Sequence, residues 1–171
     1  MSDLNGPVFL CGFMGCGKST VGKLLALKLG RKFTDMDEYI VNKQGMSIPQ
    51  IFSEKGEDYF RTAETEAVRE LSQGGGVIAC GGGAMLKKVN ADIANSSGTV
   101  VYIDVDFESC YGRISGDRNR PIVTSNTKEE LNLIYDGRVP VYKENSALTV
   151  DGSGSPEEIA ERIISLINIV K

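Results

Sequence analysis

The chain has 171 residues, of which 41% are hydrophobic and 25% are charged, and its formal net charge is −4. These values are ordinary for a globular protein, and the length favours one domain, over residues 1–171, rather than two. The acidic balance argues against a nucleic-acid surface, which needs clustered lysine and arginine.

The sequence contains no histidine, which excludes Ser-His-Asp and Cys-His catalysis and histidine metal ligands. The four cysteines lack the C-x-x-C spacing, so neither a zinc site nor a disulfide framework is predicted. No apolar run approaches the roughly 20 residues that span a bilayer, and residues 1–6 lack a basic region followed by an apolar one. We therefore expect a cytoplasmic protein that binds neither membrane nor nucleic acid.

Strand-like and helix-like segments alternate along the chain, which is typical of an α/β fold with helices on both faces of a parallel sheet. The expected strands are residues 7–11, 32–34, 77–80, 99–105 and 147–150. The expected helices are residues 20–29, 37–43, 48–53, 57–72 and 87–94, one that begins after Thr127, and a last one capped by Ser155 and Glu158. Gly45 and Gly56 are expected to end helices. The pattern predicts a three-layer α/β/α fold with a five-stranded sheet.

The first turn after a predicted strand, residues 12–19, matches the phosphate-binding pattern G-x-x-x-x-G-K-[ST]. Glycines let the backbone turn and present its N–H groups to phosphate oxygens, at the positive end of the following helix. Lys18 would reach the β and γ phosphates of a nucleotide, and the Ser19 hydroxyl would hold Mg²⁺. The residues expected to bind the nucleotide here are Gly15, Cys16, Gly17, Lys18, Ser19 and Thr20.

Two aspartates, Asp35 and Asp37, follow the second predicted strand. Alternate residues on an extended backbone point to the same side, and ligands of open parallel sheets lie beyond the carboxyl ends of the strands. Both carboxylates could therefore meet Mg²⁺ or a substrate hydroxyl. The alternative is that Asp37 only caps a helix that starts at Glu38.

Arg61 and Glu64 are three residues apart on a predicted helix, a spacing that favours a structural ion pair. The neighbouring Phe60, with Phe52, could instead form an apolar wall beside a guanidinium that binds a carboxylate. The spacing leaves both interpretations open.

Three successive glycines, Gly81, Gly82 and Gly83, follow the third predicted strand. Because glycine has no Cβ, such a segment allows a ligand to come against the backbone. The position at a strand end favours a binding role over a simple turn.

Residues 115–126 form a polar segment with Gly116 and Pro121, and a loop of this length is usually functional or disordered. Its arginines, Arg118 and Arg120, favour a lid that closes over phosphate. Further along, Arg138 adds another guanidinium. Arginine suits bidentate contacts with carboxylate and phosphate, although a solvated surface arginine is the alternative for each.

Together these residues resemble the shikimate kinase family of P-loop kinases. The matching elements are residues 12–19, Asp35-x-Asp37, Phe60-Arg61-x-x-Glu64, residues 81–83, Arg113, Arg120-Pro121 and Arg138-x-Pro140-x-Tyr142. The resemblance covers nearly the whole chain and implies transfer of the ATP γ-phosphoryl group to the 3-hydroxyl of shikimate, in the pathway to chorismate and the aromatic amino acids. It also implies a substrate-binding segment at about residues 35–62, a lid at about residues 113–126, and a monomer.

The resemblance implies a role for each matching residue. Asp37 would bind the accepting hydroxyl and act as its base, and Asp35 would hold Mg²⁺ through water. The acceptor side would be completed by Arg61 and Arg138 on the shikimate carboxylate and by residues 81–83 near the ring hydroxyls. On the donor side, Lys18 and Arg120 would contact the transferred phosphate, and Arg113 and Pro156 would lie near the adenine.

One departure concerns the segment before the last helix, residues 151–155, where family members often carry an arginine that this chain lacks. Contacts between this segment and the adenine would rely on the backbone.

Two alternatives to shikimate phosphorylation remain: a kinase of another small hydroxy acid such as gluconate, and a nucleotide-binding regulator without catalysis. The presence of Asp37, Lys18 and Arg120 weighs against the regulator.

Overall fold

The computed structural model describes residues 6–170, and within this range five parallel strands form one sheet in the order β2-β3-β1-β4-β5. The strands are β1 (Val8–Cys11), β2 (Phe33–Asp35), β3 (Val77–Ala79), β4 (Thr99–Asp104) and β5 (Leu148–Asp151). In the register of the central strand, Val8 pairs with Val77 on one side and with Thr99 on the other. The α/β fold and its parallel sheet are confirmed. The expectation that residues 1–6 carry no targeting segment concerns mainly residues 1–5, which lie outside the described range.

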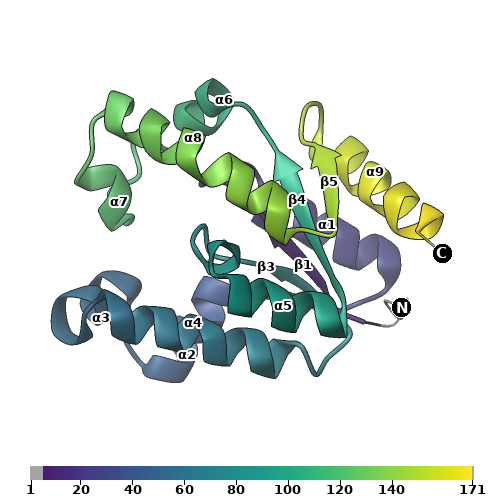
Figure 1. Ribbon diagram of the computed structural model, residues 1–171, viewed down its shortest axis with the longest axis horizontal. Coiled ribbons are helices and arrows are strands. Elements are labelled where there is room, and N and C mark those ends of the chain that lie inside the picture. The colour runs from purple at the N-terminus through teal and green to yellow at the C-terminus, as the bar shows by residue number, and fades with distance from the viewer. Residues whose placement is uncertain (1–5, 171) are drawn as a thin grey trace.

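Helices connect and cover the strands. They are α1 (Lys18–Leu29), α2 (Met36–Gln44), α3 (Ile48–Lys55), α4 (Glu57–Leu71), the 3₁₀ helix η1 (Ala84–Leu86), α5 (Lys88–Ser97), α6 (Phe107–Ile114), α7 (Pro121–Thr124), α8 (Lys128–Asn145) and α9 (Pro156–Ile169). Helix α1 packs on α9, while α5 packs on α4, on α8 and on β4. Figure 1 shows α5 and α8 in front of the strands and α1 behind them, with α3 and α7 at the end of the molecule far from both termini.

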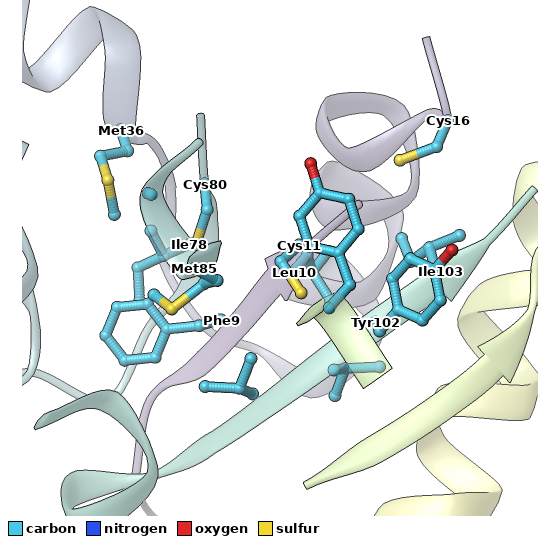
Figure 2. Close-up of a cluster of buried hydrophobic side chains, with 14 of the residues drawn as sticks. Phe9, Leu10, Cys11, Cys16, Met36, Ile78, Cys80, Met85, Tyr102 and Ile103 are labelled. Atoms are coloured by element: carbon cyan, nitrogen blue, oxygen red, sulfur yellow. The ribbon is translucent and has the colours of Figure 1, made fainter. Parts of the chain in front are cut away.

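The core lies on the central strands, where both faces of the sheet are covered (Figure 2). Phe9 and Leu10, adjacent in β1, point to opposite faces and are both fully buried. Burial on both faces explains why the strands read as continuous apolar runs. The four cysteines are free and buried. Within residues 6–170, no helix combines the length and the hydropathy that a membrane span requires.

The predicted helix signals are confirmed. Gly45 and Gly56 end α2 and α3, and Ser155 with Glu158 forms a capping box at the start of α9. Thr127 begins α8 in the same way. Local side-chain chemistry therefore sets these boundaries.

The start of α2 differs from the prediction. The helix begins at Met36, and its N-cap is Asp35, whose Oδ1 accepts a hydrogen bond from the Glu38 backbone N–H at 3.1 Å. The alternative that Asp37 is the cap is therefore wrong, and so is the placement of Asp37 on an extended strand. The carboxylate of Asp37 lies in the first helical turn and is left available for another role.

Two further helices follow β4: α6 lies before the predicted irregular segment, residues 115–126, and α7 lies inside it. Asp106 caps α6, because its side chain accepts a hydrogen bond from the Ser109 N–H at 2.8 Å, and Pro121 supplies the first turn of α7. These two helices and η1 were not predicted; α7 and η1 are too short to show an apolar period, whereas α6 is as long as the predicted α3. The lid segment thus begins at the end of α6 and contains α7.

Candidate active site

The phosphate-binding loop joins β1 to α1 and requires glycine at two positions. Gly15 has φ of 80°, and a Cβ there would lie 2.6 Å from the Cys110 carbonyl oxygen. Gly17, the N-cap of α1, has φ of 94°. The Lys18 ammonium donates to the Gly12 carbonyl at 2.7 Å and so lies across the loop. The loop has the form that the motif predicts, a tight turn that opens a helix N-terminus.

The predicted metal ligands lie together. The Ser19 hydroxyl donates to Asp35 Oδ2 at 2.9 Å, which joins the start of α1 to the end of β2. Oxygen donors of this kind suit Mg²⁺, which takes one or two protein ligands and completes its shell with phosphate and water. Of the other predicted loop residues, Cys16 is buried and Thr20 is exposed in the first turn of α1.

A cleft of about 510 Å³ lies beside the loop, at the carboxyl ends of the strands. It contains every residue that the sequence predicted for the acceptor side, namely Asp37, Arg61, Gly81, Gly82, Gly83 and Arg138, together with Arg120. Apolar side chains complete its wall: Met14, Ile48, Phe52, Phe60 and Ile122. The cleft thus combines three arginines, an apolar wall and four carboxylates, namely Asp37, Glu57, Glu64 and Asp117. Its arginines and Asp37 suit a small, anionic, hydroxylated molecule.

Asp37 is the carboxylate at the centre of this charge distribution. Burial raises its pKa, and the negative charge of Asp35 acts in the same direction. The positive charges of Lys18, Arg120 and Arg61 oppose the shift, so all three cations act on this one carboxylate. Asp37 therefore has enhanced basicity next to the groups that would hold a phosphoryl donor.

Arg61 forms the expected ion pair and also lies beside the apolar wall of the cleft. Its Nη1 donates to Glu64 Oε1 at 2.6 Å, and the same guanidinium lies 5.4 Å from the centroid of the Phe60 ring and lines the cleft. Glu64 is only 1% exposed; burial raises the pKa of its carboxyl, while Arg61 stabilises the ionised form. The ion pair fixes the direction in which Arg61 faces the cleft.

The three glycines make room chiefly for side chains. A Cβ on Gly81 would lie 2.8 Å from Asp37 Oδ1, and one on Gly83 would lie 2.5 Å from Arg61 Nη1. At Gly82 the Arg138 guanidinium would be in ordinary contact, at 3.5 Å. The segment therefore lets the charged groups of the cleft pack against the backbone.

The lid arginines differ in their surroundings. Arg120 lines the cleft, and its Nε donates to Asp117 Oδ2 at 2.9 Å, while Arg118 is exposed and does not line the cleft. Arg113, on α6, donates from Nη1 to the Gly15 carbonyl at 2.8 Å and so lies on the outer side of the phosphate loop. The sequence interpretation did not find Asp117, although its spacing of three residues from Arg120 was a usable signal.

Pro156 opens α9 outside the cleft, after the segment that lacks the family arginine. Arg162, six residues further along α9, donates from Nη1 to the Asp151 carbonyl at 2.9 Å and also bonds the Ser153 carbonyl. An arginine thus does contact this segment, but from the helix. The sequence interpretation missed it because it considered only the segment itself.

The family model described as shikimate kinase matches residues 14–168. The chain belongs to the shikimate kinase family. It is therefore a phosphotransferase with an alcohol group as acceptor, and family membership implies that it uses ATP.

Curated relatives agree over nearly the full length. The chain is 42% identical over 163 residues to a shikimate kinase of Geobacter sulfurreducens, covering 94% of this chain and 90% of that protein. It is 41% identical over 158 residues to one of Streptococcus gordonii, covering 90% of this chain and 96% of that protein.

A solved structure of the shikimate kinase of Acinetobacter baumannii in complex with shikimate matches with a TM-score of 0.91 and 38% identity, over 97% of this chain and 94% of that one. A gluconokinase of Sinorhizobium meliloti matches with a TM-score of 0.63 and 19% identity, over 98% of this chain and 94% of that one. The second likeness shows a shared fold only.

Proposed function

We propose that the protein transfers the γ-phosphoryl group of ATP to the 3-hydroxyl of shikimate, giving shikimate 3-phosphate and ADP. The observation that carries this proposal is the cleft in which Asp37 lies with Arg61 and Arg138, next to the phosphate-binding loop. Two guanidiniums beside one carboxylate base suit an acceptor with a carboxylate and a ring hydroxyl. The relative from Acinetobacter baumannii was solved with shikimate bound, which supports the same acceptor.

Asp37 would accept a hydrogen bond from the attacking hydroxyl and take its proton as the new P–O bond forms. Phosphoryl transfer has a loose transition state, so the main tasks of the protein are to align the hydroxyl and neutralise charge. The raised pKa of Asp37 brings this base closer to the working pH. Arg61 and Arg138 would hold the acceptor carboxylate, and the backbone of residues 81–83 would lie against its hydroxyls.

Lys18 and Arg120 would stabilise the charge on the transferred phosphoryl group from two sides. Lys18 would exchange its bonds with loop carbonyls for phosphate oxygens, and Arg120 would approach from the lid. Ser19 and Asp35 would hold Mg²⁺, Asp35 through water; when bound, this ion neutralises phosphate charge.

The remaining assignments concern the adenine and the lid. Arg113 lies on the outer side of the phosphate loop, a position that supports a contact with the base, and Pro156 would border the same region. Residues 35–62 would bind the acceptor, and residues 113–126 would close over it to exclude water, the competing acceptor. That the protein is a monomer, that it has a single domain and that it lies in the cytoplasm stay predictions.

An assay that couples ADP release to an absorbance change, run with shikimate, gluconate and nucleoside monophosphates, tests the acceptor. Of the three acceptors, only shikimate is expected to give turnover with ATP. Turnover with gluconate and none with shikimate would contradict the proposal, because gluconate also offers a carboxylate and hydroxyls. ATP binding without turnover on any acceptor would favour the non-catalytic regulator.

A further inference from the structure

Helix α8 presents one face to the acceptor side of the cleft. Arg138, Tyr142 and Asn145 are spaced i, i+4 and i+7 along this helix, so their side chains lie on the same face. Asn145 donates from Nδ2 to the Met85 carbonyl at 2.8 Å, and Arg138 lines the cleft. The residue between them, Tyr142, has no role in the proposed reaction.

The surroundings of Tyr142 are unusually restrictive for a phenol. The side chain is fully buried, and its ring stacks on the Tyr102 ring with a centroid distance of 5.3 Å and an interplanar angle of 20°. Its hydroxyl donates a hydrogen bond to the Gly82 carbonyl. A buried hydroxyl with so few orientations fixes the group that it bonds.

Arg138 lies one helical turn before Tyr142 on α8. Its positive charge lowers the pKa of the phenol, while burial, the largest cause, raises it. The Arg138 guanidinium also lies next to Gly82, where a Cβ would be 3.5 Å from Nη1, and 6.0 Å from the Phe13 ring centroid. Tyr142 therefore bonds Gly82 and follows Arg138 by one turn of α8, and the Arg138 guanidinium lies next to the same glycine.

We infer that Tyr142 is a positioning residue, which holds the Arg138 guanidinium and the Gly82 backbone at a fixed separation so that both meet the same acceptor molecule. The inference rests on the proposed function, because it assigns Arg138 and Gly82 to shikimate. Tyr142 does not touch the acceptor; it acts through these two groups. Its loss should therefore weaken acceptor binding while leaving the donor site intact.

Tyr142→Phe tests this inference, since it keeps the stacked ring and removes only the hydroxyl. Loss of the hydrogen bond to Gly82 is expected to raise the KM for shikimate about tenfold, with the KM for MgATP within about twofold of the unmodified protein. The matched control is Tyr102→Phe, the other member of the stack, whose hydroxyl bonds Asp104 outside the cleft. This control should leave both KM values unchanged.

The coupling to Arg138 gives a second readout. In an Arg138→Ala background, Tyr142→Phe should add much less to the shikimate KM than it does alone, because the two residues act as one unit. Additive effects would show that the hydroxyl does not act through Arg138 and would overturn the inference. An unchanged shikimate KM in Tyr142→Phe, or an equal rise in both KM values, would also overturn it.

The two proposals fail differently. If the unmodified protein does not phosphorylate shikimate, the proposed function and this inference both fail. If it does, and Tyr142→Phe only lowers the midpoint of thermal unfolding without changing the shikimate KM, the hydroxyl is structural and this inference alone fails.

Discussion

Ser19 and Asp35 are joined by a hydrogen bond of 2.9 Å between the serine hydroxyl and one carboxylate oxygen. The other oxygen of Asp35 caps α2, whose first turn carries Asp37. One aspartate therefore connects the phosphate-binding loop to the helix that presents the candidate base. The donor and acceptor halves of the site are held together by this residue.

Asp35→Asn should raise the Mg²⁺ concentration needed for half-maximal activity by about 10- to 100-fold, as loss of a supporting carboxylate does at metal sites. The amide oxygen can still cap Glu38, so the fold should persist. A Mg²⁺ titration at fixed ATP measures the effect. Asp106→Asn, which changes a helix cap outside the cleft, is the control and should leave the Mg²⁺ requirement unaltered.

The pH profile reports the raised pKa of Asp37. Because the carboxylate form is the active one, kcat/KM for shikimate should rise with pH along an ascending limb. The apparent pKa of this limb should lie above the ordinary aspartate pKa of about 3.9. Asp35→Asn removes a negative charge that raises this pKa, so the limb should move to lower pH. A limb that stays in place, measured at saturating MgATP, would show that Asp37 is not the group observed.

Asp37→Asn should lower kcat by about 10²- to 10⁴-fold and leave ATP affinity largely intact. It should also raise the midpoint of thermal unfolding at neutral pH. A carboxyl whose pKa is raised in the folded state contributes stability at low pH, and this stability is lost as the pH rises through that pKa. At pH 7 the ionised Asp37 therefore lowers the free energy of unfolding. Asp92→Asn, on the surface of α5, is the control for both measurements.

Arg120→Ala should lower kcat by about 10³-fold or more, in the range known for arginines that stabilise the transferred phosphoryl group. Arg118→Ala is the matched control from the same lid, because that side chain is exposed and does not line the cleft. Steady-state kinetics with shikimate give the comparison. Equal losses in both variants would mean that the lid acts through its net charge rather than through one guanidinium.

Gly83→Ala should raise the KM for shikimate, because the added Cβ would lie 2.5 Å from Arg61 Nη1 and displace that guanidinium. The KM for MgATP should change little. Gly112→Ala, inside α6 with open space at its Cβ position, should leave the acceptor KM unchanged and stabilise the fold by about 0.5–1 kcal/mol. If Gly83→Ala behaves like the control, Arg61 does not depend on this glycine.

Local sequence patterns were enough to predict much of the fold. The capping boxes at Thr127 and Ser155 and the glycine stops at Gly45 and Gly56 act through neighbours three or four residues away, so the sequence alone shows them. The helix α7 was not predicted, since its four residues are too few to show an apolar period.

What the sequence by itself determined is the phosphate-binding loop and the set of charged residue types, because residues 12–19 form a contiguous motif whose geometry is local. The tertiary structure alone decided which of those charges meet. It placed the local Arg61–Glu64 pair in the wall of the cleft and brought Tyr142 onto Gly82. The cleft and the Tyr142–Gly82 bond join distant segments through the packing of helices on the sheet, and sequence spacing carries no information about such distances.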